Sequence, residues 1–250
     1  MTLALVTGGE SGIGAACCVK LARDGADVIV SYYRDREAAG EVRARAEGEG
    51  GKAEGEQCDV SNEDSVRRLF DSAKSLGTVE WLVNSAGVNM SDKRLADTPA
   101  DEFDSVVAID LRGPFLTCRE FVRRLAGRSG RIVNISSIHE SAPREGGAAY
   151  DAAKGGLAQL TRTLALELAG QKVAVNGVAP GMILTPMNKD AMEDPALLRR
   201  REAAIPWGRA GQPEEVADLV AFLLSRRAEY ITGATMVIDA GLSLTLAQGA

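Results

Sequence analysis

Short apolar runs alternate with helix-forming segments along almost the whole chain, and this alternation constrains the fold more than any other feature. Apolar runs that are too short for helices predict buried strands. Seven segments are predicted as strands, at residues 3–6, 26–32, 53–59, 79–83, 131–136, 172–178 and 234–239. Strands that alternate with helices pair in parallel through right-handed crossovers. The sequence therefore predicts an α/β fold: a single domain over residues 1–250, with a doubly wound parallel sheet of seven strands and helices on both faces.

Polar or turn-forming residues lie at or just beyond the ends of five of these strands. They are Gly8, Asp59, Asn84, Ser137 and Pro180. The carboxyl ends of parallel strands meet at one edge of a sheet, and ligands of doubly wound sheets bind there. We therefore expect the functional site at this edge.

The first strand runs into a glycine-rich loop that opens a helix, with glycines at Gly8, Gly12 and Gly14. In this layout the backbone N–H groups at the start of the helix are placed to bind a phosphate. The spacing differs from the G-x-G-x-x-G dinucleotide fingerprint. A plain turn is the alternative interpretation, and the position at the first strand-to-helix junction favours the phosphate site.

Three side chains suggest proton transfer. Tyr150 and Lys154 lie four residues apart at the start of a segment with helical periodicity, so they share one helix face. A positive charge about 4 Å from a phenol contributes roughly 4 kcal/mol at an effective dielectric of about 20, which stabilises the phenolate. Ser137, at a strand end, is then placed to hold a substrate oxygen while Tyr150 carries the proton. A chance pairing on an amphipathic helix is the alternative.

The composition excludes several classes of function. A net charge of −6 argues against a nucleic-acid or anionic-membrane surface, and no apolar stretch is long enough to span a bilayer. The four cysteines have no Cys-x-x-Cys spacing, which indicates a reduced, cytoplasmic protein. With one histidine, no zinc site is expected.

As a set, the motifs resemble those of the short-chain dehydrogenase/reductase family over essentially the full chain. The matching motifs are Thr7-Gly-x-x-x-Gly-Ile-Gly14, Asp59-Val60, Asn84-Ser-Ala-Gly87, Ser137 with Tyr150-x-x-x-Lys154, and Pro180-Gly-Met-Ile-Leu-Thr185. The resemblance implies a Rossmann-type fold and hydride transfer between a nicotinamide and a secondary alcohol or carbonyl. It also implies a homotetramer packed through the helices that carry Leu116 and Tyr150.

The resemblance implies roles for particular residues. Tyr150 is the general acid/base, Ser137 polarises the carbonyl, and Lys154 also holds the nicotinamide ribose. The implied cofactor site consists of Gly8, Ser11, Gly12, Ile13, Gly14, Arg34, Asp59, Val60, Asn84, Ala86, Gly87, Tyr150, Lys154, Pro180, Gly181, Ile183 and Thr185.

Asp110 departs from the family pattern. It falls between two predicted helices, at residues 100–109 and 113–125, where the family usually has an asparagine that anchors a water relay behind the lysine. An aspartate keeps the backbone carbonyl but cannot donate from its ionised side chain. We expect the relay position to be retained and the carboxylate to help keep Lys154 protonated.

The choice of cofactor depends on the end of the second strand, which reads Ser31-Tyr-Tyr-Arg34. An acidic residue there would bind the adenosine ribose and repel a 2′-phosphate, whereas an arginine accommodates that phosphate. The sequence therefore favours NADP(H), with NAD(H) as the alternative. Two features count against NADP: Glu10 lies in the glycine loop, and no basic residue precedes Gly12. The alternative interpretation of Arg34 is a solvated surface charge with no role in cofactor binding.

The run Ser136-Ser-Ile-His139-Glu140 resembles that of glucose 1-dehydrogenase-like and acetoin/diacetyl reductase-like members. With His139, Met187 and Asn188 around the substrate, and a helical lid at residues 186–203, a small-molecule sugar, polyol or hydroxyketone is the expected substrate. A 3-oxoacyl-carrier-protein reductase shares the motifs and would need a basic docking patch. Its candidate residues are Arg123, Arg124, Arg128, Arg199, Arg200 and Arg201. A non-catalytic dinucleotide-binding sensor is the alternative from another class, which an intact Ser137, Tyr150 and Lys154 set disfavours.

Overall fold

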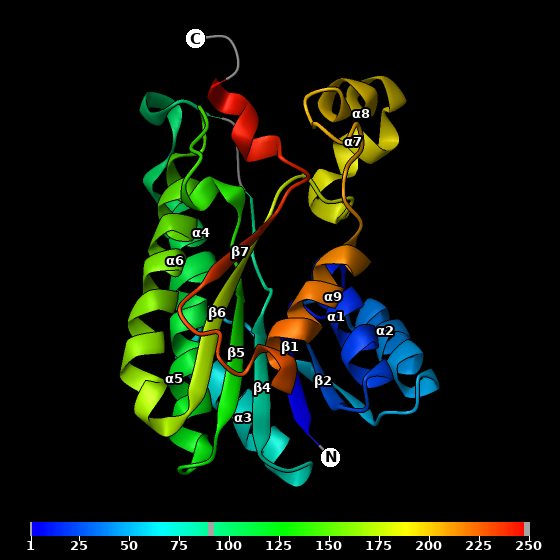
Figure 1. Ribbon diagram of the computed structural model, residues 1–250, viewed down its shortest axis with the longest axis vertical. Helices are drawn as coiled ribbons and strands as arrows, with labels where there is room; N and C mark the ends of the chain where they lie inside the picture. The colour runs from blue at the N-terminus through cyan, green and yellow to red at the C-terminus, as the bar shows by residue number, and fades with distance from the viewer. Residues whose placement is uncertain (1, 90–92, 248–250) are drawn as a thin grey trace.

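Seven parallel strands form one sheet in the computed structural model, which describes residues 2–89 and 93–247 (Figure 1). The strands are β1 (Leu3–Thr7), β2 (Asp27–Tyr32), β3 (Ala53–Gln57), β4 (Val79–Asn84), β5 (Gly130–Ile135), β6 (Val173–Pro180) and β7 (Thr235–Ile238). Their order is β3-β2-β1-β4-β5-β6-β7, and every neighbouring pair is parallel. The chain winds outward in both directions from β1 and β4, so the predicted α/β, doubly wound fold class is confirmed.

Burial on both faces explains the apolar runs of the central strands. All of β1 and the last five residues of β2 are buried. A parallel sheet that is covered by helices on both faces requires such continuous apolar strands. The edge strand β3 is mostly exposed and correspondingly polar, with Ala53 buried at its start.

Two layers of helices enclose the sheet. The helices are α1 (Gly12–Arg23), α2 (Arg36–Gly48), α3 (Glu63–Ser72), α4 (Ala100–Val107), α5 (Gly113–Leu125), α6 (Ala148–Leu168), α7 (Lys189–Glu193), α8 (Pro195–Glu202) and α9 (Pro213–Leu224). Figure 1 shows α1, α2 and α9 on one side of the sheet and α4, α5 and α6 on the other. The first group shares one hydrophobic core with the sheet, whereas α3, α5 and α6 contribute to a second.

The two helices predicted at residues 100–109 and 113–125 are joined without a break. A π-helical turn, Ala108–Arg112, connects α4 to α5, so the first helix ends earlier than the sequence suggests. Pro114 lies in the first turn of α5, where a missing N–H group is tolerated. The π turn places Asp110, which is fully buried, against the neighbouring helix α6.

The predicted lid segment is helical. It comprises a short turn at Pro186–Asn188 followed by α7 and α8. Figure 1 shows α7 and α8 beyond the carboxyl edge of the sheet, on the α1 and α9 side. Within residues 2–89 and 93–247, no helix combines the length and apolar character needed to cross a membrane.

Candidate active site

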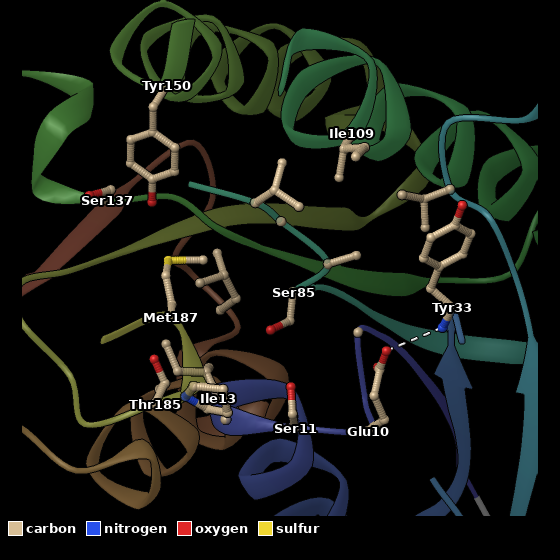
Figure 2. A pocket seen from close by; sticks show the side chains of 18 of the residues that line it. Glu10, Ser11, Ile13, Tyr33, Ser85, Ile109, Ser137, Tyr150, Thr185 and Met187 are labelled. Atoms are coloured by element: carbon tan, nitrogen blue, oxygen red, sulfur yellow. Dashed lines mark hydrogen bonds between the residues drawn. The ribbon is translucent and has the colours of Figure 1, made fainter. Parts of the chain in front are cut away.

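A cavity of about 820 Å³ opens at the carboxyl edge of the sheet. Figure 2 shows Tyr150, Ser137 and Met187 near one end of it and Glu10 and Tyr33 near the other. Most of the predicted site residues line this cavity. They are Gly8, Ser11, Gly12, Ile13, Arg34, Asp59, Val60, Ala86, Gly87, Ser137, Tyr150, Lys154, Pro180, Gly181, Ile183, Thr185, Met187 and Asn188. The ends of six strands and the helix α6, far apart in the sequence, therefore contribute to one concave surface.

The glycine loop is pressed against the backbone around it. Gly8 has a φ of +62°, and a Cβ atom there would lie 2.8 Å from the Cα atom of Ala86. The hydroxyl oxygen of Thr7 accepts hydrogen bonds from the backbone N–H groups of Ser85, at 3.1 Å, and Ala86, at 3.2 Å. The first loop is thereby fixed against the loop after β4, and both loops line the cavity.

Gly14 has a structural role instead of a place in the cavity lining. A Cβ atom on Gly14 would lie 2.0 Å from the carbonyl oxygen of Gly8. A side chain there is sterically excluded, because the first turn of α1 folds directly onto the loop that precedes it. Gly14 therefore allows the N-terminus of α1 to face the cavity.

Tyr150 and Lys154 lie in the first two turns of α6, and both are buried. The Lys154 ammonium lies 5.3 Å from the centroid of the Tyr150 ring and donates a hydrogen bond to the carbonyl oxygen of Ile135, at 3.2 Å. In Figure 2 the Tyr150 hydroxyl points into the cavity beside Ser137. The hydroxyl oxygen of Ser137 accepts a hydrogen bond from the N–H group of His139, at 3.2 Å, so its own proton is available to a ligand.

Lys154 is paired with Asp110. The ammonium nitrogen lies 3.1 Å from Oδ2 of Asp110, and the two side chains are 6% and 0% exposed. Oδ1 of the same carboxylate accepts a hydrogen bond from the N–H group of Val88, at 2.8 Å. Burial by itself lowers the pKa of Lys154, but the charges of Asp110 and Tyr150 and the hydrogen bond to Asp110 outweigh it, so the pKa is raised. Lys154 is thus held as a cation behind Tyr150.

Asn84 lies behind the cavity wall. Its side-chain amide donates to Oδ1 of Asn134, at 2.8 Å, and its carbonyl oxygen accepts from the Thr117 hydroxyl, at 2.6 Å. Asn134 in turn donates to the hydroxyl of Thr161 on α6, at 2.9 Å. This buried chain of hydrogen bonds ties β4 and β5 to α5 and α6.

His139 also lies outside the described lining of the cavity. The ring nitrogen Nδ1 is 2.8 Å from the carbonyl oxygen of Ala142 and donates to it, which fixes the tautomer. The ring meets Tyr150 edge to face, with centroids 6.1 Å apart. The structure therefore places His139 beside Tyr150 and outside the described cavity lining, and its predicted contact with a substrate stays a prediction.

Some lining residues are absent from the set that the sequence predicts. They are Glu10, Tyr33, Ser85, Ile109 and Ser136 among others. Glu10 and Ser85 lie within predicted motifs, and Tyr33 precedes Arg34, so proximity in sequence was a usable signal. Ile109 directly precedes Asp110 in the sequence, but only the π turn brings it to the cavity.

Comparison with known proteins identifies the family. A family profile described as Enoyl-(Acyl carrier protein) reductase matches residues 8–243. The 3beta-hydroxysteroid dehydrogenase 1 of Eggerthella lenta is 39% identical over 96% of this chain and 93% of its own length. The glucose 1-dehydrogenase 2 of Bacillus subtilis is 34% identical, over 96% and 94% of the two chains. The crystal structure of acetoin dehydrogenase from Enterobacter cloacae superposes with a TM-score of 0.90, at 35% identity, over 100% of this chain and 98% of that one. This chain belongs to the short-chain dehydrogenase/reductase family of oxidoreductases.

Proposed function

We propose that this protein is an NAD(P)-dependent oxidoreductase that interconverts a secondary alcohol and its carbonyl on a sugar, a polyol or a small hydroxyketone. The observation that carries the proposal is the meeting of Ser137, Tyr150 and Lys154 at one end of the cavity whose other end contains the glycine loop. Proton-transfer groups and a phosphate-binding loop on one continuous surface suit a reaction between a dinucleotide and a substrate oxygen.

The residues present fit a dinucleotide. The cavity of about 820 Å³ lies within the range of about 300–1,000 Å³ typical of ligand pockets. Gly8, Ser11 and Gly12 would bind the pyrophosphate with backbone N–H groups at the N-terminus of α1. Ile183 and Thr185, on the loop after β6, would hold the nicotinamide near Tyr150.

The side chains of this protein would move the proton. When bound, the nicotinamide supplies or accepts the hydride. Tyr150 gives its phenolic proton to the carbonyl oxygen in reduction and removes it from the alcohol in oxidation. The buried Lys154 ammonium stabilises the phenolate that remains, and the Ser137 hydroxyl donates to the substrate oxygen. Asp110 keeps the ammonium charged from the opposite side.

We also propose NADP(H) as the favoured cofactor, with NAD(H) accepted. Arg34 lines the cavity just beyond β2, where a 2′-phosphate of the adenosine ribose would lie in a doubly wound fold. Its guanidinium stacks on the Tyr33 ring, with Cζ 4.6 Å from the centroid. Stacking on a ring keeps an exposed arginine close to the cavity mouth.

The proposed substrate class is supported by the residues of the lid segment that line the cavity and by the names of related proteins. Met187 and Asn188 line the cavity, and the Asn188 amide donates to the carbonyl oxygen of Ile183, at 2.8 Å. One apolar and one polar side chain suit a small hydroxylated substrate. Relatives named glucose 1-dehydrogenase and acetoin dehydrogenase act on molecules of this kind by their names.

The acyl-carrier alternative is less well supported. The carrier is acidic and would need unpaired basic residues on this protein. Arg123 is paired with Glu120, at 2.9 Å, and Arg124 with Asp71, at 2.9 Å. The Arg201 guanidinium is 2.7 Å from the Asp190 carboxylate. These ion pairs neutralise much of the patch that the sequence suggests for docking.

The replacement Tyr150→Phe tests the proposed function. Removing the hydroxyl should lower kcat by about 10²–10⁴-fold, because general acid–base catalysis contributes about that much. Binding of NADPH and NADH, measured by calorimetry, should stay within about twofold, since the ring remains. Tyr230→Phe, at a fully exposed tyrosine, is the matched control and should change neither quantity. Wild-type rates in Tyr150→Phe would remove Tyr150 from the mechanism.

A substrate screen defines the reaction further. Sugars, polyols, diketones and acetoacetyl thioesters should be assayed with both cofactors by the absorbance of the reduced nicotinamide. We expect turnover of at least one sugar, polyol or hydroxyketone and little with the thioesters. Preference for the thioesters would favour the acyl-carrier reductase, and a lack of turnover in every class together with tight dinucleotide binding would favour the sensor.

A further inference from the structure

The end of β2 lacks the acidic side chain that usually binds the adenosine ribose. The residues there are Ser31, Tyr32, Tyr33 and Arg34. In doubly wound dinucleotide-binding folds, an aspartate or glutamate near this position accepts a hydrogen bond from the ribose 2′-hydroxyl, and an arginine accommodates a 2′-phosphate. The residues at the end of β2, considered alone, therefore favour binding of NADP over NAD.

A carboxylate nevertheless reaches the same place from the glycine loop. Oε1 of Glu10 accepts a hydrogen bond from the backbone N–H group of Tyr33, at 3.2 Å, and Glu10 lines the cavity (Figure 2). The loop thus supplies an acidic group at the end of β2, although the last residues of the strand are not acidic. The contact spans 23 positions of sequence, so only the folded chain brings the two residues together.

The second oxygen of this carboxylate is available. Oε2 of Glu10 is buried, and the described parts of the chain offer it no hydrogen-bond partner. Arg34 does not neutralise it: among the described residues Arg34 forms no ion pair with Glu10, and its guanidinium donates to the Tyr33 hydroxyl instead, at 3.2 Å. A buried oxygen without a partner is unfavourable, and a hydroxyl group that donates to it would relieve this.

A ribose hydroxyl and a 2′-phosphate would meet this oxygen differently. The hydroxyl of NAD can donate a hydrogen bond to the carboxylate. The phosphate of NADP carries a charge of about −1.5 to −2 at neutral pH and is repelled by a second anion. Arg34, which is exposed and lines the cavity, would attract the phosphate.

We propose that Glu10 is a specificity-determining residue for the cofactor: its carboxylate accepts a hydrogen bond from the adenosine ribose of NAD and opposes the 2′-phosphate of NADP, against the attraction of Arg34. This proposal rests on the proposed function, because it assumes that the cavity binds a dinucleotide. The proposal explains how one site would accept both cofactors. Glu10 and Arg34 have opposite charges and come from different loops, and both would act on the group at the 2′ position of the adenosine ribose.

Equilibrium binding of NADH and NADPH to the substrate-free protein tests the proposal. Glu10→Gln should tighten NADPH by about tenfold, because the like charge is removed. NADH should change by no more than about threefold, because an amide still forms a hydrogen bond with a hydroxyl. Arg34→Ala should act in the opposite direction and weaken NADPH more than NADH. Calorimetry gives both dissociation constants without any turnover.

Glu37→Gln is the matched control, since it removes the same charge from an exposed acid in the first turn of α2, outside the described cavity lining. It should leave the ratio of the two dissociation constants unchanged. Glu10→Ser is a second variant, to be used if thermal unfolding shows that Glu10→Gln is damaged, and it should shift the ratio in the same direction.

The outcomes separate the two proposals. If the wild-type protein binds neither dinucleotide, the proposed function fails. If it binds them and the NADPH-to-NADH ratio stays within twofold of wild type in both well-folded Glu10 variants, only the specificity role of Glu10 is refuted. A shift of similar size in Glu37→Gln would also refute it, because a general charge effect would then explain the result.

Discussion

At the scale of single residues, the site contains a buried ion pair between Asp110 and Lys154. Burying two charges is unfavourable, and their attraction repays this only when further hydrogen bonds satisfy both groups. Here the N–H group of Val88 binds Asp110, and the carbonyl oxygen of Ile135 binds Lys154. The arrangement keeps a cation close to Tyr150 while the surrounding interior remains neutral.

Replacing Asp110 by asparagine should therefore change the pH dependence of catalysis. Asp110 raises the pKa of Lys154, so its removal lowers that pKa. We expect the alkaline limb of kcat/KM, where Lys154 loses its proton, to move to lower pH, with activity retained near neutrality. Asp101→Asn, at an exposed residue of α4, should leave the profile unchanged. An unchanged alkaline limb in Asp110→Asn would contradict the coupling.

The same variant should be less stable. The folded-state pKa of Lys154 is raised, so the stabilising contribution is fully present below the unfolded-state pKa and is lost as the pH rises through the folded-state value. Near neutral pH the variant should lose about 3 kcal/mol of unfolding free energy. This loss of free energy is at the lower end of the range for breaking a buried ion pair, because the asparagine side chain can still accept the hydrogen bond from the N–H group of Val88. Urea denaturation of both proteins measures the difference.

At the scale of elements, the start of α9 is held by a cluster of charges. Arg209 donates to Glu215 through two bonds, at 2.8 and 2.7 Å, and the N–H group of Gln212 donates to the same carboxylate, at 2.8 Å. The pKa of Glu215 is lowered to about 2, and the hydrogen bond from Arg209 is the largest cause of this decrease. Since α9 packs against α1, this cluster also supports the helix that follows the glycine loop.

Glu215→Gln should lower stability in a pH-dependent way. A depressed folded-state pKa gives stability that is present above the ordinary value of 4.5 and lost as the pH falls through about 2. At pH 7 we expect a loss of about 0.5–1 kcal/mol, as for a solvent-screened pair. The gap to wild type should close between pH 4.5 and about 2. Glu214→Gln, on the same helical turn, should show no such pH dependence. Urea midpoints measured at several pH values decide the matter.

At the scale of the whole molecule, the helices on one side of the sheet expose apolar side chains. Phe103 on α4, Phe115 on α5 and Leu166 on α6 are 39%, 43% and 82% exposed. Figure 1 shows these helices side by side. Exposed apolar side chains on neighbouring helices favour a protein–protein interface. We propose that the protein is a homotetramer packed through α5 and α6.

Light scattering tests the assembly. The wild-type protein should have four times the 26.3-kDa mass of one chain. Leu166→Asp should shift the population to smaller species, because a charge would be buried in the interface. Met192→Asp, at a half-exposed residue of α7 on the other side of the molecule, should leave the mass unchanged. A monomeric wild-type protein, or the same mass in both variants, would disprove this packing.

The sequence alone determined the features that depend on neighbours along the chain. The alternation of apolar runs and helical segments predicted the parallel sheet, and the spacing of Tyr150 and Lys154 placed both on one face of α6. These inferences held because helix and strand periods are set by local geometry.

Only the tertiary structure decided which distant groups meet. It set the contact between Asp110 and Lys154, which the sequence only suggested, and brought the Glu10 carboxylate to the end of β2. It also decided a local contact, that of the His139 ring with the carbonyl group of Ala142. The connection of α4 to α5 through a π turn was decided in the same way. These contacts join segments that are far apart or replace one local conformation by another. Their free energy comes from burial and desolvation in the assembled core, which no short stretch of sequence contains.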